Sequence, residues 1–133
     1  MGGIFSSSRR RGDEGEDKGE DEFETALSKA KKLVSSTPVV IFSKTYCVYC
    51  QRVKKLLSQL GASHKVIELD VERDGGEIQS ALAEWAGQRT VPNVFIGGNH
   101  IGGCDMVMAK HKEGKLLSLL TDAGAIGNKS SHM

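Results

Sequence analysis

Helix-like and strand-like patterns alternate along this chain, and their order is the feature that most restricts its fold. Apolar residues at helical spacing indicate helices, whereas short apolar runs between chain breakers indicate buried strands. The predicted elements are, in chain order, helix 22–36, strand 39–43, a helix between Cys47 and Gly61, strand 65–70, a helix between Ile78 and Gly87, strand 93–96, strand 100–101, and helices 104–113 and 115–122.

This order predicts an α/β fold with a four-stranded mixed sheet flanked by helices. A strand–helix–strand unit places its two strands in parallel, and a hairpin adds two antiparallel strands. The turn of the hairpin is expected at Gly97-Gly98-Asn99, and Gly75-Gly76 is expected to break the chain before the helix that ends at Gly87.

Length and charge exclude several classes of protein. The 133 residues suit one domain, and 18 Lys plus Arg against 17 Asp plus Glu give a formal charge of +1. A strongly basic nucleic-acid binder is therefore not expected. The longest apolar run, at 39–42, is far shorter than the roughly 20 residues that span a bilayer. Because the first residues lack the apolar run of a secretory signal, we expect a cytoplasmic protein.

The two ends of the chain differ from its middle. No aliphatic or aromatic residue occurs from Ser6 to Asp21, and such a segment buries too little apolar surface to offset the entropy of ordering it. We therefore predict a disordered N-terminal tail at 1–21, one domain at 22–126 and a flexible C-terminal tail at 127–133.

The first six residues, Met1 to Ser6, fit the myristoylation pattern M-G-x-x-x-[ST], with Gly2 as the acceptor. A chance match is the alternative, because few positions of the pattern are constrained. One acyl chain binds membranes only marginally. The basic run Arg9 to Arg11 would add attraction to anionic lipid, and the acidic block from Asp13 would weaken it. The hypothesis is a weak, reversible membrane association.

Cys47 and Cys50 are the strongest chemical signal in the sequence, because they follow a predicted strand and open a predicted helix. The unpaired N–H groups and positive dipole at a helix start stabilise a thiolate, which is the nucleophilic form of cysteine. Lys44 would add positive charge nearby. Since Cys50 lies one turn further along the helix, it can attack a mixed disulfide on Cys47. We interpret Cys47 as the nucleophile and Cys50 as the resolving thiol.

Two other interpretations of this pair are weaker. A structural zinc site needs four ligands, and the chain offers no second Cys-x-x-Cys motif. Two inert buried cysteines are also less favoured, because a strand-to-helix junction usually leaves the first side chain near the surface. The additional zinc-ligand candidates would be Cys104, His64, His100 and His111.

Three motifs in order, 43–50, 89–96 and 101–105, resemble the glutaredoxin family. More narrowly, they resemble plant-type dithiol class I glutaredoxins, and the resemblance covers about residues 23–126. It implies a thioredoxin-like fold and a cis peptide bond before Pro92. It also implies a glutathione-dependent oxidoreductase that reduces protein–glutathione mixed disulfides and protein disulfides. Glutathione and such proteins are then the expected partners, and no nucleic acid is expected.

The resemblance also implies a glutathione site. The backbone of Val91 would pair with the glutathione cysteine like an added strand. Lys44 and Gln79 match positions that bind the glycine carboxylate. The expected site residues are Lys44, Tyr49, Gln79, Val91, Pro92, Gly103, Cys104 and Asp105, the last three holding the γ-glutamyl end. For Cys104 a packing role and a redox role remain open, and Arg89 either adds positive field or is a plain surface charge.

Val48 departs from the family pattern, in which proline or glycine follows the nucleophile. Relatives with glycine there form a dimer that shares one [2Fe–2S] cluster, held by the nucleophilic cysteine of each subunit and two glutathione thiols. The alternative function is therefore a cluster carrier or redox sensor. It would be a monomer without the cluster and a homodimer with it, with Cys47 as the metal ligand. A flavoprotein-fed, thioredoxin-like reductase is a weaker third reading, because Lys44, Gln79 and Asp105 suit glutathione.

Overall fold

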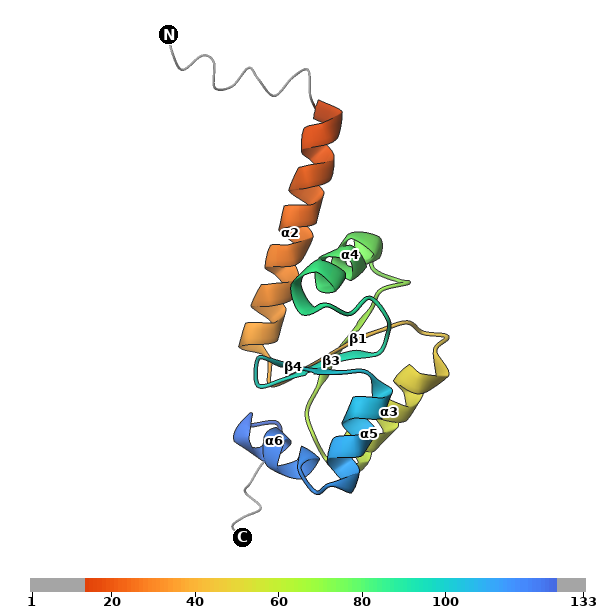
Figure 1. Cartoon of the computed structure of the whole chain (residues 1–133), viewed down its shortest axis with the longest axis vertical. Helices are drawn as coiled ribbons and strands as arrows, with labels where there is room; N and C mark the ends of the chain where they lie inside the picture. The colour runs from red at the N-terminus through yellow and green to blue at the C-terminus, as the bar shows by residue number, and fades with distance from the viewer. Residues whose placement is uncertain (1–13, 127–133) are drawn as a thin grey trace.

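The computed structural model describes residues 14–126, and the predicted alternation of helices and strands is present in it (Figure 1). The helices end where the sequence places glycine or a change of pattern, as at Gly87, which is left-handed (φ 75°) and closes α4. The elements are α2 (Glu14–Ser36), β1 (Val39–Ser43), α3 (Val48–Gln59), β2 (Lys65–Glu68), α4 (Gly75–Ala86), β3 (Asn93–Ile96), β4 (Asn99–Gly102), α5 (Cys104–Lys112) and α6 (Leu116–Asp122).

The strands form one four-stranded mixed sheet in the order β2–β1–β3–β4. β1 and β2 run parallel, with Val40 opposite Lys65. β3 runs antiparallel to both β1 and β4, and the hairpin between β3 and β4 turns at Gly97-Gly98. The predicted fold class is therefore confirmed, including the parallel strand–helix–strand half and the antiparallel hairpin.

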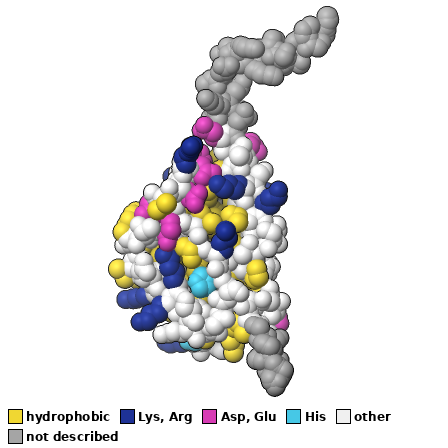
Figure 2. Space-filling model, turned by 180° about the vertical axis from the view of Figure 1, so that it is seen from behind, with side chains coloured by type: hydrophobic (Ala, Val, Ile, Leu, Met, Phe, Trp, Pro, Cys, Tyr) yellow, Lys and Arg dark blue, Asp and Glu magenta, His cyan; other side chains and the backbone are white. Residues whose placement is uncertain are grey.

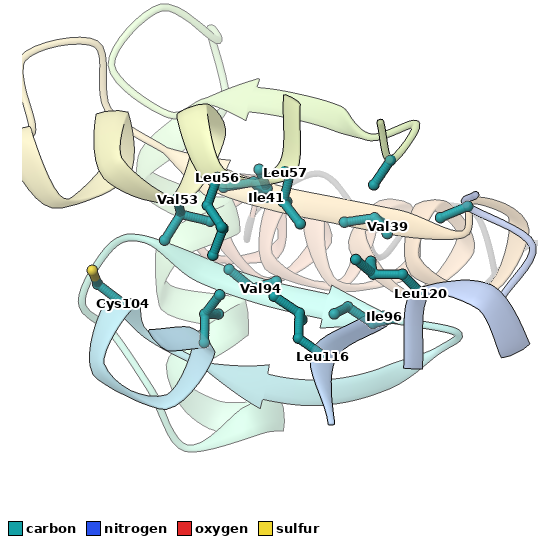
Figure 3. Packing of buried hydrophobic residues seen from close by; sticks show 13 residues of the cluster. Val39, Ile41, Val53, Leu56, Leu57, Val94, Ile96, Cys104, Leu116 and Leu120 are labelled. Atoms are coloured by element: carbon teal, nitrogen blue, oxygen red, sulfur yellow. The ribbon is translucent and has the colours of Figure 1, made fainter. Parts of the chain in front are cut away.

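Side chains of the central strands alternate between two hydrophobic cores, one on each face of the sheet. Val39 and Ile41 face the core formed with α3, α5 and α6, part of which is drawn in Figure 3. Val40 and Phe42 face the other core, with α2 and α4. Figure 1 shows the same layers, with α2 and α4 on one side of the sheet and α3, α5 and α6 on the other. Because both faces are covered, every residue of β1 and β3 is buried.

α2 begins earlier than the sequence predicted. The apolar pattern indicated a helix from residue 22, but the helix starts at Glu14, so residues 14–21 belong to it and not to a disordered tail. The segment 14–21 holds no aliphatic or aromatic residue in the sequence. The spacing of apolar residues, which predicted the other helices, therefore cannot detect a helix in this segment. The expectations for 1–13, including Gly2, and for 127–133 lie outside the described residues.

Gly75 and Gly76 do not break the chain but form the first turn of α4. Gly75 is buried against the end of the preceding segment, where a Cβ atom would lie 1.8 Å from the carbonyl oxygen of Leu69. Gly76 has open space around it. The first glycine thus allows a close backbone approach and does not act as a helix breaker. β2 ends at Glu68, two residues before the end predicted from the sequence.

The surface carries mixed charge. On the face in Figure 2, Lys and Arg side chains lie among Asp and Glu side chains, as the near-zero net charge leads one to expect. Within residues 14–126, no helix has both the length and the apolar character needed to cross a bilayer.

Candidate active site

Cys47 lies in the turn that joins β1 to α3, and several hydrogen bonds hold this turn. The Cys47 N–H donates to the carbonyl of Lys44 at 3.1 Å. The backbone N–H and hydroxyl of Thr45 both donate to the carboxylate of Asp70, and this bonding lowers the pKa of Asp70. Cys47 itself has extended backbone angles (φ −88°, ψ 120°) and occupies the N-cap position of α3. The predicted placement of Cys47 at a helix start is therefore confirmed.

The pKa of the Cys47 thiol is lowered. Burial acts to raise it, but the backbone N–H and thiol of Cys50, the backbone N–H of Tyr49 and the charge of Lys54 together outweigh burial. These N–H groups belong to the first turn of α3, where no carbonyl of the helix can accept them. A thiolate at Cys47 therefore takes the position that a side-chain oxygen takes in an ordinary N-cap.

Lys54 adds positive charge near Cys47, since it follows Cys47 by seven residues, or two turns of α3. The sequence expectation named Lys44 for this part, and a contribution from Lys44 stays a prediction. The ammonium of Lys54 donates to the carboxylate of Glu68 on β2 at 2.6 Å, and this carboxylate also accepts a hydrogen bond from the buried hydroxyl of Ser43 at 2.7 Å. These bonds tie α3 to β1 and β2.

Cys50 is fully buried, whereas Cys47 is half-buried. Burial and the neighbouring Cys47 raise the pKa of Cys50, while the backbone of Lys44 and the hydroxyl of Ser43 lower it by less. Cys50 is therefore protonated under conditions in which Cys47 is a thiolate. This difference suits one attacking thiol and one resolving thiol.

The loop before β3 faces Cys47. The Val91–Pro92 peptide bond is cis, as expected, and the sulfur of Cys47 lies 3.9 Å from the carbonyl oxygen of Val91. Among the described residues, no protein group is hydrogen-bonded to the Val91 N–H. An extended peptide can therefore use the Val91 backbone beside the nucleophile.

A pocket of about 530 Å³ opens between this loop and the start of α5. Six of the eight predicted binding residues lie around it. Tyr49 at its edge is half-exposed, and the guanidinium of Arg52 lies 5.3 Å from the centre of its ring. The lining residues are Tyr49, Gln88, Thr90, Val91, Pro92, Gly103, Cys104, Asp105 and Met106. The start of α5 brings unpaired N–H groups toward this space.

The other two predicted binding residues are not part of this lining. Gln79, on α4, donates through its side chain to the carbonyl of Arg89 at 2.9 Å. Lys44 is half-buried in the turn before Cys47, and Arg89 is exposed. The geometry therefore places Gln79 next to the segment leading to Val91, and a role in binding for Lys44 and Gln79 stays a prediction.

Cys104 packs at one end of the core between the sheet and α5, with its sulfur directed away from the other labelled side chains (Figure 3). Burial raises the pKa of its thiol, and the charge of Arg52 lowers it by less. Burial suits a packing role, whereas the place of Cys104 in the pocket lining suits a redox role, so both roles stay predictions. In residues 14–126, no three His, Cys, Asp or Glu side chains gather in a way that could hold a metal ion.

Sequence reasoning missed Lys54, Gln88, Thr90 and Met106. Lys54 had a usable signal, since residues 47, 50 and 54 follow helical spacing on one face. Thr90 lies within the 89–96 motif, directly before Val91, but it was not named as a binding residue. Gln88 and Met106 had no signal, because only the fold brings them together across the pocket.

Four exposed apolar side chains surround the redox pair. Tyr46 is 72% exposed, Val48 61%, Tyr49 54% and Met106 49%. Tyr46, Val48 and Tyr49 are close together in the chain, and the fold brings Met106 to the same pocket as Tyr49. A group of exposed large apolar side chains marks a surface suited to contact with another protein.

Comparison with known proteins gives a consistent result. The glutaredoxin family model matches residues 39–101. Glutaredoxin-C1 of Arabidopsis thaliana is 61% identical over 133 residues, which is the full length of both chains. A glutaredoxin of Ricinus communis is 70% identical over 101 residues, covering 76% of this chain and 99% of the relative.

Solved structures agree with these relatives. The buckwheat glutaredoxin–glutathione complex has a TM-score of 0.80 and 64% identity, covering 81% of this chain and 98% of that one. The holo form of glutaredoxin C1 from Populus tremula x tremuloides has a TM-score of 0.76 and 63% identity, covering 80% and 96%.

Proposed function

The chain belongs to the glutaredoxin family of glutathione-dependent thiol–disulfide oxidoreductases, and we propose that Cys47 carries out its reaction on proteins that are glutathionylated or hold a disulfide. The observation that carries this proposal is the position of the Cys47 sulfur. It is half-exposed at the start of α3, has a lowered pKa, and lies 3.9 Å from the carbonyl oxygen of Val91, which lines the pocket of about 530 Å³.

The first step is a thiol–disulfide exchange. The Cys47 thiolate attacks the glutathione sulfur of a protein–glutathione disulfide, so that a bond from Cys47 to glutathione forms and the protein–glutathione bond breaks. The electron pair of the broken bond leaves with the protein sulfur, which takes a proton from water. The protein is thereby reduced, and Cys47 carries the glutathione.

Two thiols can clear Cys47. A second glutathione thiolate attacks the bound glutathione sulfur, which yields glutathione disulfide and restores the Cys47 thiolate. Alternatively, Cys50 loses its proton and attacks the Cys47 sulfur, which releases glutathione and leaves a Cys47–Cys50 disulfide. The raised pKa of Cys50 slows the second route, because the attacking species must be a thiolate.

Binding of glutathione is assigned to the pocket lining. An extended ligand backbone beside Val91 would place its sulfur near Cys47. Its γ-glutamyl carboxylate would meet the N–H groups at the start of α5, and Asp105 would face the ammonium. Lys44 and Gln79 are assigned to the glycine carboxylate.

The test compares two serine variants. Cys47→Ser should abolish release of glutathione from a glutathionylated protein, while Cys50→Ser should keep most of it, because glutathione can clear Cys47. Activity is measured as release of a fluorescent glutathione from a labelled protein. Full activity in Cys47→Ser would overturn the assignment.

A second function, binding of a [2Fe–2S] cluster between two copies, is favoured by the donor set. Of the three cysteines only Cys47 is accessible, so one chain offers one thiolate, and two chains with two glutathione molecules would complete four ligands. The exposed Tyr46, Val48 and Tyr49 beside Cys47 would be covered in such a dimer. A bound cluster would supply one-electron redox chemistry and would occupy the nucleophile.

This second function has a direct test. Protein purified without oxygen and with glutathione should be brown and elute as a dimer, and Cys47→Ser should be colourless and monomeric. Val48→Gly should hold at least as much cluster as the natural chain, and Val48→Pro should hold less. Colourless monomer from the natural chain would remove the cluster role and leave the oxidoreductase proposal intact.

A further inference from the structure

Gln88 connects both ends of the cis-proline loop. Its side-chain Nε2 donates to the carbonyl of Thr90 at 3.0 Å and to the carbonyl of Pro92 at 3.0 Å. These two carbonyls flank Val91 in the chain. The side chain is half-buried and forms part of the pocket wall.

The backbone of Gln88 is fixed as well. Its carbonyl accepts a hydrogen bond from the side chain of Asn93 at 3.2 Å. Asn93 is only 1% exposed, and its Oδ1 lies 2.8 Å from Nε2 of His100 on β4. Asn93 of the sheet therefore fixes the backbone of Gln88, while the side-chain amide of Gln88 binds the cis-proline loop.

The same amide group borders the start of α5. A Cβ atom on Gly103 would lie 3.8 Å from Gln88 Nε2, and one on Gly102 would lie 3.8 Å from Gln88 Oε1. The Gln88 amide thus occupies the space between the loop that carries Val91 and the helix start that faces the ligand. A change in this side chain reaches both walls of the pocket.

We propose that Gln88 is a positioning residue for glutathione: by binding the Thr90 and Pro92 carbonyls, it holds the Val91 peptide groups toward the ligand. The inference rests on the proposed use of Val91. Both neighbouring carbonyls are already paired, whereas the Val91 N–H has no protein partner among the described residues and its carbonyl faces the Cys47 sulfur. The backbone of the ligand can then pair with the Val91 peptide groups in a single alignment.

The physical effect concerns binding and not the reactivity of the thiol. Without the two hydrogen bonds, the loop carbonyls turn toward water and the Val91 peptide must be ordered by the ligand itself. We expect glutathione binding to weaken about tenfold, since two ordinary hydrogen bonds are worth that much together. The alkylation rate of Cys47 should stay unchanged, because the N–H groups that lower its pKa belong to Tyr49 and Cys50 on α3 and not to the cis-proline loop.

The test uses Gln88→Met, which keeps the length of the side chain and removes the donor. Gln88→Lys restores a hydrogen-bond donor at this position but also adds a positive charge. It is therefore measured at about 1 M salt, where the effect of that charge is screened. Gln59→Met, at the exposed far end of α3, is the matched control. For each full-length protein we would measure KM and kcat for a glutathionylated peptide, the Kd of S-methylglutathione by NMR, the iodoacetamide rate at Cys47 and the thermal midpoint.

The proposal expects Gln88→Met to raise KM and Kd about tenfold, with kcat and the alkylation rate unchanged, and Gln88→Lys to recover most of the loss. Unchanged Kd in Gln88→Met overturns it. Equal loss in the Met and Lys variants, together with a lower thermal midpoint, also overturns it, because Gln88 would then act only through packing. Turnover by the natural chain tests the proposed function separately, and the Kd comparison needs no turnover.

Discussion

The ammonium of Lys54 and the carboxylate of Glu68 form an ion pair at 2.6 Å, with only 19% and 23% of the two side chains exposed. The same ammonium acts on the thiol of Cys47 and lowers its pKa. An ion pair that joins α3 to β2 therefore also sets part of the electrostatic environment of the nucleophile.

Removal of this charge should weaken the nucleophile at low pH. In Lys54→Gln the pKa of Cys47 rises, because a positive charge is lost and Glu68 keeps its negative charge. Less thiolate is then present below the pKa, so the iodoacetamide rate at a pH below the pKa of Cys47 should fall modestly, while the rate well above the pKa stays the same. The control is Lys55→Gln, an exposed neighbour. Equal pH profiles for the two variants would exclude a contribution from Lys54.

The three thiols should react in a fixed order. The pKa of Cys47 is lowered, and burial raises the pKa of both Cys50 and Cys104. At neutral pH, iodoacetamide should therefore modify Cys47 first and leave the other two largely unmodified, since both are buried and protonated. Peptide mapping by mass spectrometry after short exposure measures the order. Early modification of Cys104 would contradict its placement in the core.

Two adjacent glycines should respond in opposite ways to the same substitution. Gly75→Ala forces a Cβ atom against the Leu69 carbonyl, so we expect a loss of about 2–3 kcal/mol in the free energy of unfolding, as for other overpacked sites. Gly76→Ala meets open space within a helix and should add about 0.5–1 kcal/mol. Urea unfolding of both variants provides the measurement. Similar losses at both positions would contradict the proposed reason for the glycine at 75.

At the N-terminus, we propose that Gly2 is myristoylated and that a cytoplasmic protein thereby gains weak membrane association. The natural chain should incorporate a myristate analogue in a cell extract, and Gly2→Ala should not. The membrane-bound share should be small and salt-sensitive, because one acyl chain binds marginally and Arg9 to Arg11 act through charge. Equal labelling of the two proteins would end the hypothesis.

Much of the fold followed from local patterns. The run Val39 to Ser43 is buried on both faces, and its alternate residues enter two different cores, so its strand character was readable without knowledge of its neighbours. Residues 14–21 of α2 were missed because this part of the sequence holds no aliphatic or aromatic residue. Gly75 was wrongly predicted to break the chain, because the group that requires a glycine there, the carbonyl of Leu69, belongs to another segment.

For the site, the sequence alone predicted a nucleophile, a resolving thiol and the residues of the family motifs, because spacing along one helix and ordered motifs are local properties. Only the tertiary structure showed that Lys54 contributes charge to Cys47, and that the side chain of Gln88 binds the carbonyls on both sides of Val91. Charge acts through space and hydrogen bonds join distant segments, so both depend on how α3, α4, β3 and α5 pack. The sequence predicted which cysteines react. The packing of the helices against the sheet decides the direction in which the pKa of each cysteine is shifted.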